Sequence, residues 1–308
     1  MAEVVNLKVV PSTPCELDFA WYEIIRAELV RKAVGQAGRV LDAGCGQGKV
    51  ILMLSRQITR GVGVDISERE IRWAELARSK RRIRNVTFRQ ADATALPFPA
   101  RSFDVVLLLG DVFSYDNLYD KHARALNELR RVLRTGGTAV HESMNWDWEY
   151  RAYPPRGASF TRAPDGAFRF HRSRRDASGY ETCRNYGVLP GTALDRWIRG
   201  QEWPVSPQGW NTQLEVVEES PLPRRYLEPL GVSRGRHYTQ AGLTRLYRKA
   251  GFREVRVIPY GQTYDIAAKA GILEQIRPLR GRLAKGEAEL AFSLRLGSGP
   301  WLFLVARK

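Results

Sequence analysis

The feature that most constrains this chain is a glycine-rich turn that joins a short apolar run to a predicted helix. Residues 39–48 read Arg-Val-Leu-Asp-Ala-Gly-Cys-Gly-Gln-Gly, and a second apolar run over residues 61–65 ends in Asp65. This order is that of a βαβ unit, which holds a nucleotide-shaped ligand over its strand ends. Gly44 and Gly46 lack the Cβ that would keep a ligand off the backbone. Asp65 follows at the tip of the next strand, where its carboxylate can accept both hydroxyls of a ribose.

The glycine spacing and the acid before it favour a ligand with a positive charge. Dinucleotide-binding turns read G-x-G-x-x-G and bring a pyrophosphate to a helix N-terminus. Here the spacing is G-x-G-x-G, and Asp42 precedes the turn. A carboxylate at this place repels a pyrophosphate and suits a ligand that carries an ammonium group. The last glycine, Gly48, allows the following helix to pack close to the sheet.

With three later segments, the turn resembles the class I S-adenosylmethionine-dependent methyltransferases. The sequence around Asp92 and Ala93 looks like the adenine-contacting acidic motif of that family. Residues 103–110 look like its fourth strand, and residues 129–137 look like the turn before its fifth strand. The resemblance implies an α/β protein with a Rossmann-like seven-stranded methyltransferase sheet and S-adenosyl-L-methionine as cofactor. A NAD-binding domain is the alternative.

The resemblance also implies where the cofactor is held. Residues 16–34 have the apolar spacing of an amphipathic helix, and in the family a helix at this place covers the cofactor as a lid. On it, Arg26 is a candidate partner for the cofactor carboxylate, and Tyr22 either packs in the core or contacts the cofactor. The expected cofactor-binding residues are Asp42, Gly44, Gly46, Gly48, Asp65, Ile66, Asp92, Ala93, Leu109, Gly110, Tyr22 and Arg26.

The regular alternation of strands and helices breaks after the predicted fifth strand, residues 138–142. The following residues are rich in aromatic side chains, Pro, Gly and Arg, and short alternating runs such as residues 167–172 predict antiparallel strands. The core pattern resumes at Tyr238. We therefore predict a methyltransferase core made of residues 1–145 and 237–308, and an antiparallel insertion, residues 146–236, that covers the substrate.

The methyl acceptor is expected beyond the carboxyl ends of the fourth and fifth strands. The segments after these strands are similar to the glycine N-methyltransferase branch of the family, although Met144 stands where that branch has an arginine. By this resemblance Asn145 lies near the substrate. Asp111 either forms a solvated turn or acts on the substrate as a base or an ammonium partner, and His141 either is structural or faces the substrate. The candidate substrate-positioning residues are Asp111, Tyr115, His141 and Asn145.

The charge of the chain leaves two kinds of substrate open. The formal net charge is +16, and the larger part of it falls in residues 146–308. Such an excess suits a nucleic-acid binder, but it is also found on arginine-rich solvated surfaces. The sequence thus predicts methyl transfer to a small molecule, at nitrogen or oxygen, with an RNA methyltransferase as the alternative. In that alternative, phosphates are contacted by Arg169, Arg172, Arg174 and Arg175.

Other sequence features narrow the class of protein. No apolar run approaches the ~20 residues that span a bilayer, and the first residues have no secretory pattern. The three cysteines are too few and too scattered for a disulfide framework or a zinc site. We therefore expect a cytoplasmic enzyme without a membrane partner or a metal, and the sequence leaves its oligomeric state open.

Overall fold

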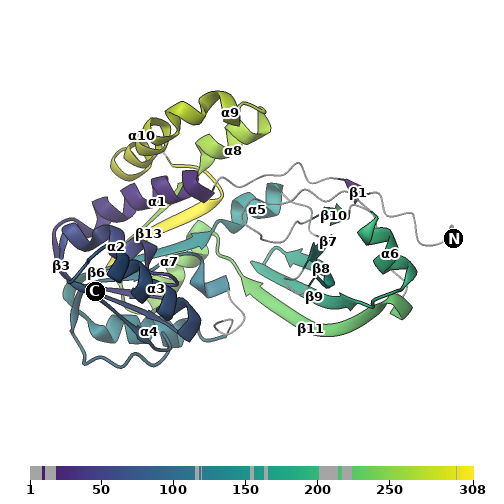
Figure 1. Ribbon diagram of the computed structural model, residues 1–308. Coiled ribbons are helices and arrows are strands. Elements are labelled where there is room, and N and C mark those ends of the chain that lie inside the picture. The colour runs from purple at the N-terminus through teal and green to yellow at the C-terminus, as the bar shows by residue number, and fades with distance from the viewer. Residues whose placement is uncertain are drawn as a thin grey trace. The chain divides into compact units, whose positions relative to one another are not determined.

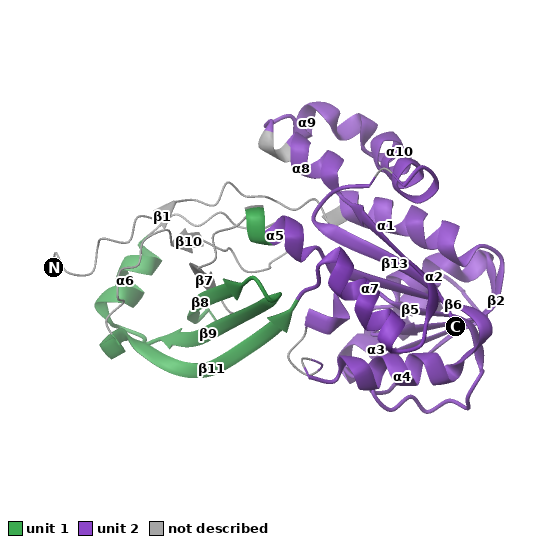
Figure 2. Cartoon of the chain, turned by 180° about the vertical axis from the view of Figure 1, so that it is seen from behind, with its two compact units in different colours: residues 1–18, 150–236 green, residues 19–149, 237–308 purple. Residues whose placement is uncertain are grey.

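The computed structural model in Figure 1 describes most of the chain. The described residues are 9–10, 19–114, 118, 120–152, 156–162, 166–200, 214–216, 224–295 and 297–308. The chain divides into two compact units: residues 19–149 with 237–308 form the core unit, and residues 1–18 with 150–236 form the smaller unit (Figure 2). Among the described residues, no helix has both the length and the apolar character needed to cross a membrane.

The core unit contains the predicted seven-stranded sheet. Its strand order is β12-β13-β6-β5-β2-β3-β4. The strands from β4 to β6 in this order run parallel, whereas β13 pairs antiparallel with both β6 and β12. The strands are β2 (Ala37–Ala43), β3 (Ile58–Asp65), β4 (Val86–Gln90), β5 (Phe103–Leu108), β6 (Leu133–Met144), β12 (Arg253–Tyr260) and β13 (Trp301–Arg307). The Rossmann-like α/β fold class is confirmed.

Helices cover both faces of this sheet because its central strands are apolar on both sides. Along β5, Val105 and Leu107 belong to one buried cluster, and Val106 and Leu108 belong to the other. The first cluster packs against α1 (Phe19–Val34), α2 (Lys49–Met53) and α10 (Arg280–Ser293). The second packs against α4 (His122–Val132) and α7 (Gln240–Lys249). The other helices of this unit are α3 (Glu68–Lys80), α8 (Gln262–Lys269) and α9 (Leu273–Ile276).

The start of α3 and the start of β6 are each set by specific contacts. The Ser67 hydroxyl caps α3 by accepting the backbone N–H of Glu70 at 3.4 Å. The strand predicted over residues 138–142 begins earlier, at Leu133, because this buried residue pairs with Phe103 of β5.

The smaller unit contains the predicted antiparallel strands. Its sheet has the order β1-β10-β7-β8-β9-β11, and every neighbouring pair is antiparallel. The strands are β1 (Val9–Val10), β7 (Arg156–Arg162), β8 (Phe168–Asp176), β9 (Tyr180–Val188), β10 (Leu214–Val216) and β11 (Leu227–Arg236). Leu194 and Ile198 of α6 (Ala193–Arg199) pack on Phe168 and Phe170 of β8.

The domain boundaries differ from the prediction at the N-terminus and at the start of the insertion. Residues 1–18 group with the smaller unit and residues 146–149 with the core unit, whereas the sequence predicted residues 1–18 in the core and residues 146–149 in the insertion. For residues 1–18, the physical reason is that β1 pairs with β10. Residues 146–149 stay with the core because Asn145 and Tyr238 form a parallel β-bridge, and the N–H of Trp146 donates to the carbonyl of Tyr238 at 3.0 Å. A covering role for the insertion stays a prediction.

Candidate active site

The glycine turn after β2 has the geometry that its sequence predicts. The backbone N–H groups of Gly44 and Cys45 both donate to the carbonyl of Val64 in β3, at 2.8 and 2.9 Å. Gly44, Gly46 and Gly48 have φ angles of +77°, +48° and +72°. These left-handed angles favour glycine because other residues place a Cβ too close to the backbone. The turn therefore needs glycine at all three positions.

The last two glycines of this turn serve different purposes. A Cβ on Gly48 would lie 2.4 Å from the ring of Phe88 in β4 and 3.3 Å from the Cβ of Ala74 in α3. The close packing expected at Gly48 is therefore present. A Cβ on Gly46 would meet no atom within 4 Å. Gly46 thus leaves open space above the turn, which a ligand can occupy.

Asp65 lies at the tip of β3 and is oriented by two backbone groups. One carboxylate oxygen accepts the N–H of Gly46 at 2.9 Å, and the other accepts the N–H of Ser67 at 2.9 Å. Each oxygen keeps a second lone pair, and the side chain is only half-buried. The carboxylate can therefore accept further hydroxyl donors beside the turn. The adjacent Ile66 is exposed, at 53%.

The acidic motif after β4 is also held by the backbone. Asp92 accepts the N–H of Thr94 at 2.7 Å, which fixes one carboxylate oxygen of Asp92. Ala93 is buried. Asp92 is half-buried.

A buried ionic network joins α1 to the ends of β5 and β6. Glu142, with 1% of its side chain exposed, is 3.2 Å from a guanidinium nitrogen of Arg26. The same oxygen accepts the N–H of Gly110 at 2.8 Å, and the other accepts the hydroxyl of Tyr260. Attraction to Glu142 raises the pKa of Arg26, although burial opposes this. Glu142 was not identified from the sequence.

Asp42 is buried at the end of β2 close to this network. Burial raises the pKa of Asp42 to about 7, the charge of Arg26 opposes this, and Asp65 adds to it. An acid with this pKa is close to half-protonated at neutral pH. The sequence predicts that the charge of Asp42 repels a pyrophosphate. Burial of Asp42 weakens this repulsion, because the protonated acid carries no charge.

Two residues expected at the cofactor lie in the apolar core. Tyr22 packs against Tyr264, with ring centroids 4.9 Å apart, and against Trp301 at 6.0 Å. Leu109 is also buried in this cluster. Gly110 follows it with a φ of +77° and is exposed.

The predicted substrate-positioning residues that the structure describes have different surroundings. His141 is fully buried and bonds the hydroxyl of Tyr247 at 2.8 Å, and burial lowers its pKa to about 3, so this imidazole is neutral. Asn145 is also buried, and its amide donates to the carbonyl of Gly299 at 2.8 Å. Tyr115 lies outside the described residues.

Asp111 instead lies with two residues that the sequence analysis missed. Its Oδ2 is 3.5 Å from Nδ1 of His237, and the same nitrogen is 3.6 Å from Oε2 of Glu149. Oδ1 of Asp111 accepts the hydroxyl of Ser143 at 3.1 Å and the N–H of Met144 at 3.2 Å. We call Asp111, Glu149 and His237 the acid–imidazole cluster. It lies where β5 and β6 end.

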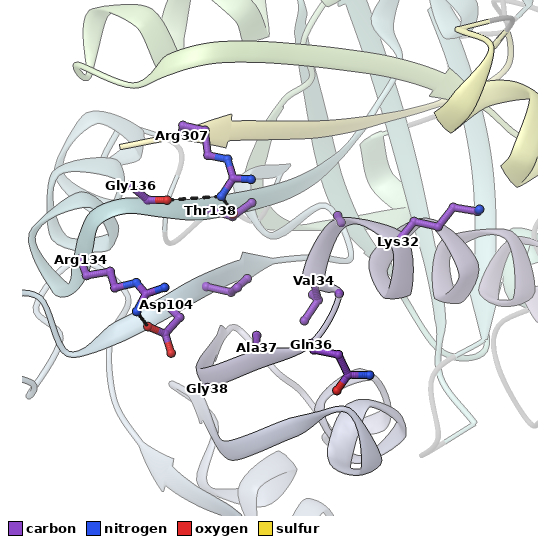
Figure 3. A pocket seen from close by; sticks show the side chains of 13 residues that line it. Lys32, Val34, Gln36, Ala37, Gly38, Asp104, Arg134, Gly136, Thr138 and Arg307 are labelled. Atoms are coloured by element: carbon purple, nitrogen blue, oxygen red, sulfur yellow. Dashed lines mark hydrogen bonds and ion pairs between the residues drawn. The ribbon is translucent and has the colours of Figure 1, made fainter.

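A separate cavity opens at the amino-terminal ends of the parallel strands, on the side of the core sheet opposite the glycine turn. Its volume is about 410 Å³, and its lining includes Gly38, Asp104 and Thr138, near the amino-terminal ends of β2 and β5 and in the first half of β6 (Figure 3). Arg134 pairs with Asp104 at 2.6 Å, and Arg307 bonds the hydroxyl of Thr138 at 2.7 Å. The cavity is remote from the glycine turn, which follows the carboxyl end of β2.

Comparisons with known proteins agree with this fold and turn. Residues 40–137 match the family described as "Methyltransferase domain". A ubiquinone/menaquinone biosynthesis C-methyltransferase of Shewanella frigidimarina is 28% identical over 191 residues, which are 57% of this chain and 74% of that protein. A demethylmenaquinone methyltransferase of Thermus thermophilus is 39% identical over 106 residues, which are 33% of this chain and 45% of that protein.

Solved structures share the fold at low sequence identity. An S-adenosylmethionine-dependent methyltransferase from Clostridium acetobutylicum has a TM-score of 0.55 and 11% identity, with 95% of this chain and 98% of that chain covered. The CcbJ methyltransferase from Streptomyces caelestis has a TM-score of 0.54 and 14% identity, with 92% and 88% covered. With the strand order and the glycine turn, these findings show a methyltransferase domain with the fold of S-adenosylmethionine-dependent methyltransferases. S-adenosyl-L-methionine is the cofactor of this class.

Proposed function

We propose that this methyltransferase acts on a small-molecule acceptor. The observation that carries the proposal is the relative from Shewanella frigidimarina, which is named for ubiquinone/menaquinone biosynthesis and is matched over 74% of its length. That relative is named a C-methyltransferase. A carbon atom is therefore a third candidate acceptor, beside the nitrogen or oxygen expected from the sequence. A place in the glycine N-methyltransferase branch stays a prediction.

The residues around the glycine turn fit the cofactor. The open space above Gly46 admits a ligand to the backbone, and the acceptor lone pairs of Asp65 suit the two hydroxyls of a ribose. The guanidinium of Arg26 suits a carboxylate, and it would exchange Glu142 for that partner or share it. When bound, the cofactor supplies a methyl group on a positively charged sulfur. The chain then has to orient the acceptor toward that methyl group and exclude water.

The smaller unit supports RNA as a second candidate substrate. Side chains alternate along β8, so Arg172 and Arg174 lie on one face while Arg169 and Arg175 lie on the other. The four predicted arginines therefore do not form one surface. On the first face, Arg184 of β9 lies directly across from Arg172, and Arg234 of β11 shares a cross-strand row with Arg174. We call the exposed set on this face the arginine face: Arg172, Arg174, Arg184 and Arg234.

A transfer assay with cofactor labelled in its methyl group tests the first candidate. The acceptors are a primary amine, a phenol, a carboxylic acid, 1,4-naphthalenediol and bulk RNA. We expect label in one of the small molecules and none in RNA, and mass spectrometry of the product then identifies the methylated atom. Label in RNA alone would overturn the proposal.

Binding of RNA at several salt concentrations separates the two candidates independently. An enzyme that tracks phosphates shows a log–log salt slope of about −0.7 for each phosphate of a single strand. We expect weak binding that vanishes near physiological salt. The test variant carries Arg172→Glu and Arg184→Glu, and Arg169→Glu on the opposite face is the matched control. Submicromolar binding at physiological salt that only the test variant loses would favour RNA.

A further inference from the structure

One exposed stripe of α3 joins apolar and basic side chains. Its members follow one another at steps of three and four residues, which is the spacing of one helix face: Arg69, Trp73, Leu76 and Lys80. All four are exposed, and the two apolar side chains have exposed fractions of 55% for Trp73 and 62% for Leu76. We call these four residues the α3 stripe. Ile66, just before the helix, is exposed as well, at 53%.

Packing of α3 on the sheet does not account for this stripe. The helix is held through its other side, where Ala74 is buried and lies close to Gly48 of the glycine turn. Single apolar side chains on a surface are common. Here a tryptophan and a leucine lie one helical turn apart, and both are more than half exposed. Neighbouring exposed apolar side chains of this kind mark contact surfaces.

Basic charge continues past the end of α3. Residues 76–91 contain six lysine or arginine residues and no acidic residue. Five of the six are exposed: Lys80, Arg81, Arg82, Arg84 and Arg89. The next strand, β4, is the edge strand of the core sheet. Glu75 of α3 accepts the N–H of Phe88 in β4 at 3.2 Å, so the helix, the basic run and the edge strand lie together.

This combination of side chains suits the surface of a membrane. Tryptophan is enriched at the level of the lipid headgroups. Lysine and arginine lay their apolar stems along an apolar surface while their charged ends stay in a polar layer, and basic clusters are attracted to anionic lipids. A nucleic acid fits less well, because single strands are bound by several stacking aromatic rings, and the α3 stripe has one.

We propose that the α3 stripe and the basic residues 80–84 form a docking surface for a membrane that carries anionic lipids. Trp73 and Leu76 enter the boundary between headgroups and acyl chains, and the cations contact lipid phosphates. Binding of this kind is peripheral and needs no membrane-spanning helix. The sequence predicted no membrane partner because it has no spanning run, which does not bear on a surface contact. The inference does not depend on the identity of the methyl acceptor.

Sedimentation with lipid vesicles tests the electrostatic part. The vesicles are phosphatidylcholine alone, or equal parts of phosphatidylcholine and phosphatidylglycerol. We expect binding to the anionic vesicles only, and release at about 1 M salt, where charges are screened beyond about 3 Å. Each Lys or Arg near an anionic surface strengthens binding by about fivefold. A variant with three reversed charges should therefore bind at least about 100-fold more weakly: Lys80→Glu, Arg81→Glu and Arg84→Glu.

A control with the same net charge separates this surface from the basic character of the whole chain. The formal net charge of +16 alone attracts the protein to anionic vesicles. The control therefore reverses three charges of the arginine face: Arg172→Glu, Arg174→Glu and Arg184→Glu. We expect the control to bind within about threefold of the wild type, because charges away from the contact are screened.

Fluorescence tests the apolar part. Brominated phosphatidylcholine quenches only those tryptophans that reach the acyl chains. The chain has eight tryptophans, so Trp73→Phe identifies the contribution of this one. We expect quenching of the wild type and markedly less in this variant. Trp73→Gln with Leu76→Gln should weaken vesicle binding by about tenfold.

A matched control for the apolar variant comes from the end of α10. Leu290 and Leu294 are exposed to a similar degree, at 47% and 61%. Around them, residues 285–295 contain two acidic and two basic residues. Leu290→Gln with Leu294→Gln should leave vesicle binding unchanged. All variants should keep the melting temperature and the calorimetric cofactor affinity of the wild type, because none of them touches the glycine turn.

Three outcomes would overturn the proposal. The first is no sedimentation with anionic vesicles. The second is equal binding by the α3 charge variant and the arginine-face control, or equal quenching in the wild type and Trp73→Phe, since a basic protein adsorbs by charge alone. The third is binding of single-stranded RNA, without binding of vesicles, that only the α3 variants lose. This last result would assign the surface to a nucleic acid.

Discussion

Removal of the charge of Glu142 should destabilise the core unit far more than removal of a surface acid. In Glu142→Gln, the guanidinium of Arg26, whose side chain is only 20% exposed, loses its nearer carboxylate partner and keeps Glu23 at 3.8 Å. In the wild type, the N–H of Gly110 and the hydroxyl of Tyr260 both donate to Glu142. The NH₂ group of the introduced glutamine is itself a donor, so it faces one of these two donors and that hydrogen bond is lost. Breaking a buried pair by removing one partner costs roughly 3–5 kcal/mol. Because Arg26 keeps some contact with water, we expect the lower end of this range.

Urea and thermal unfolding followed by circular dichroism measure this loss. About 3 kcal/mol corresponds to a fall in melting temperature of roughly 6–12 °C for a unit of this size. The matched control is Glu28→Gln, whose carboxylate pairs with Arg31 at 3.0 Å on the surface of α1. An exposed pair contributes about 0–1 kcal/mol.

A double-mutant cycle with Arg26→Met isolates the pair itself. We expect a coupling free energy above about 1.5 kcal/mol, within the range for contacting residues. The reasoning is refuted if Glu142→Gln loses no more stability than Glu28→Gln and the coupling is below about 0.5 kcal/mol.

Three further predictions concern the turn and its acids. Burial raises the pKa of Asp42 to about 7, so the folded chain keeps a proton that the unfolded chain loses above about pH 4; stability therefore falls as pH rises from 4 to 7. Asp42→Asn removes this fall. Between pH 4.5 and pH 7.5, urea unfolding should therefore show that the unfolding free energy of the variant rises by about 3 kcal/mol relative to that of the wild type. Gly48→Ala should lower the melting temperature more than Gly46→Ala, because only the former places a Cβ against Phe88; equal effects would contradict this packing. Asp65→Ala should weaken cofactor binding by roughly 10- to 100-fold, and calorimetry that finds unchanged affinity would remove Asp65 from the site.

The fold and the glycine turn were predictable because their signals are local. The residues of the turn are contiguous, and the spacing of its three glycines predicts where the backbone has positive φ. Apolar runs marked the parallel strands for the same reason. The start of β6 at Leu133 was missed, because it depends on pairing with Phe103, about thirty residues away.

The networks around the turn were not predictable because they depend on which way a strand faces. His141 and Glu142 are neighbours on β6, so their side chains point to opposite sides of the sheet. His141, predicted to be either structural or near the substrate, bonds Tyr247, whereas Glu142, which no sequence pattern marked, reaches Arg26 and Gly110. The arginines of β8 show the same limit, since neighbours in the sequence were taken for neighbours on a surface.

His237 shows a second limit. It stands one residue before the point where the core pattern resumes, and nothing in its immediate sequence distinguishes it. Its significance comes from Asp111 and Glu149, which are distant in the sequence and reach it only through tertiary structure. A single sequence gives no signal for a contact of this kind.

The β-bridge between Asn145 and Tyr238 has a consequence for how such chains diversify. Because the segment between them leaves and re-enters the core at adjacent residues, its ends span almost no distance. Lengthening a closed loop adds only about 0.6 kcal/mol for each doubling of its length. The core can therefore exchange the whole segment for another of different size or shape without moving a strand. The bridge makes this position a natural site for domain grafting.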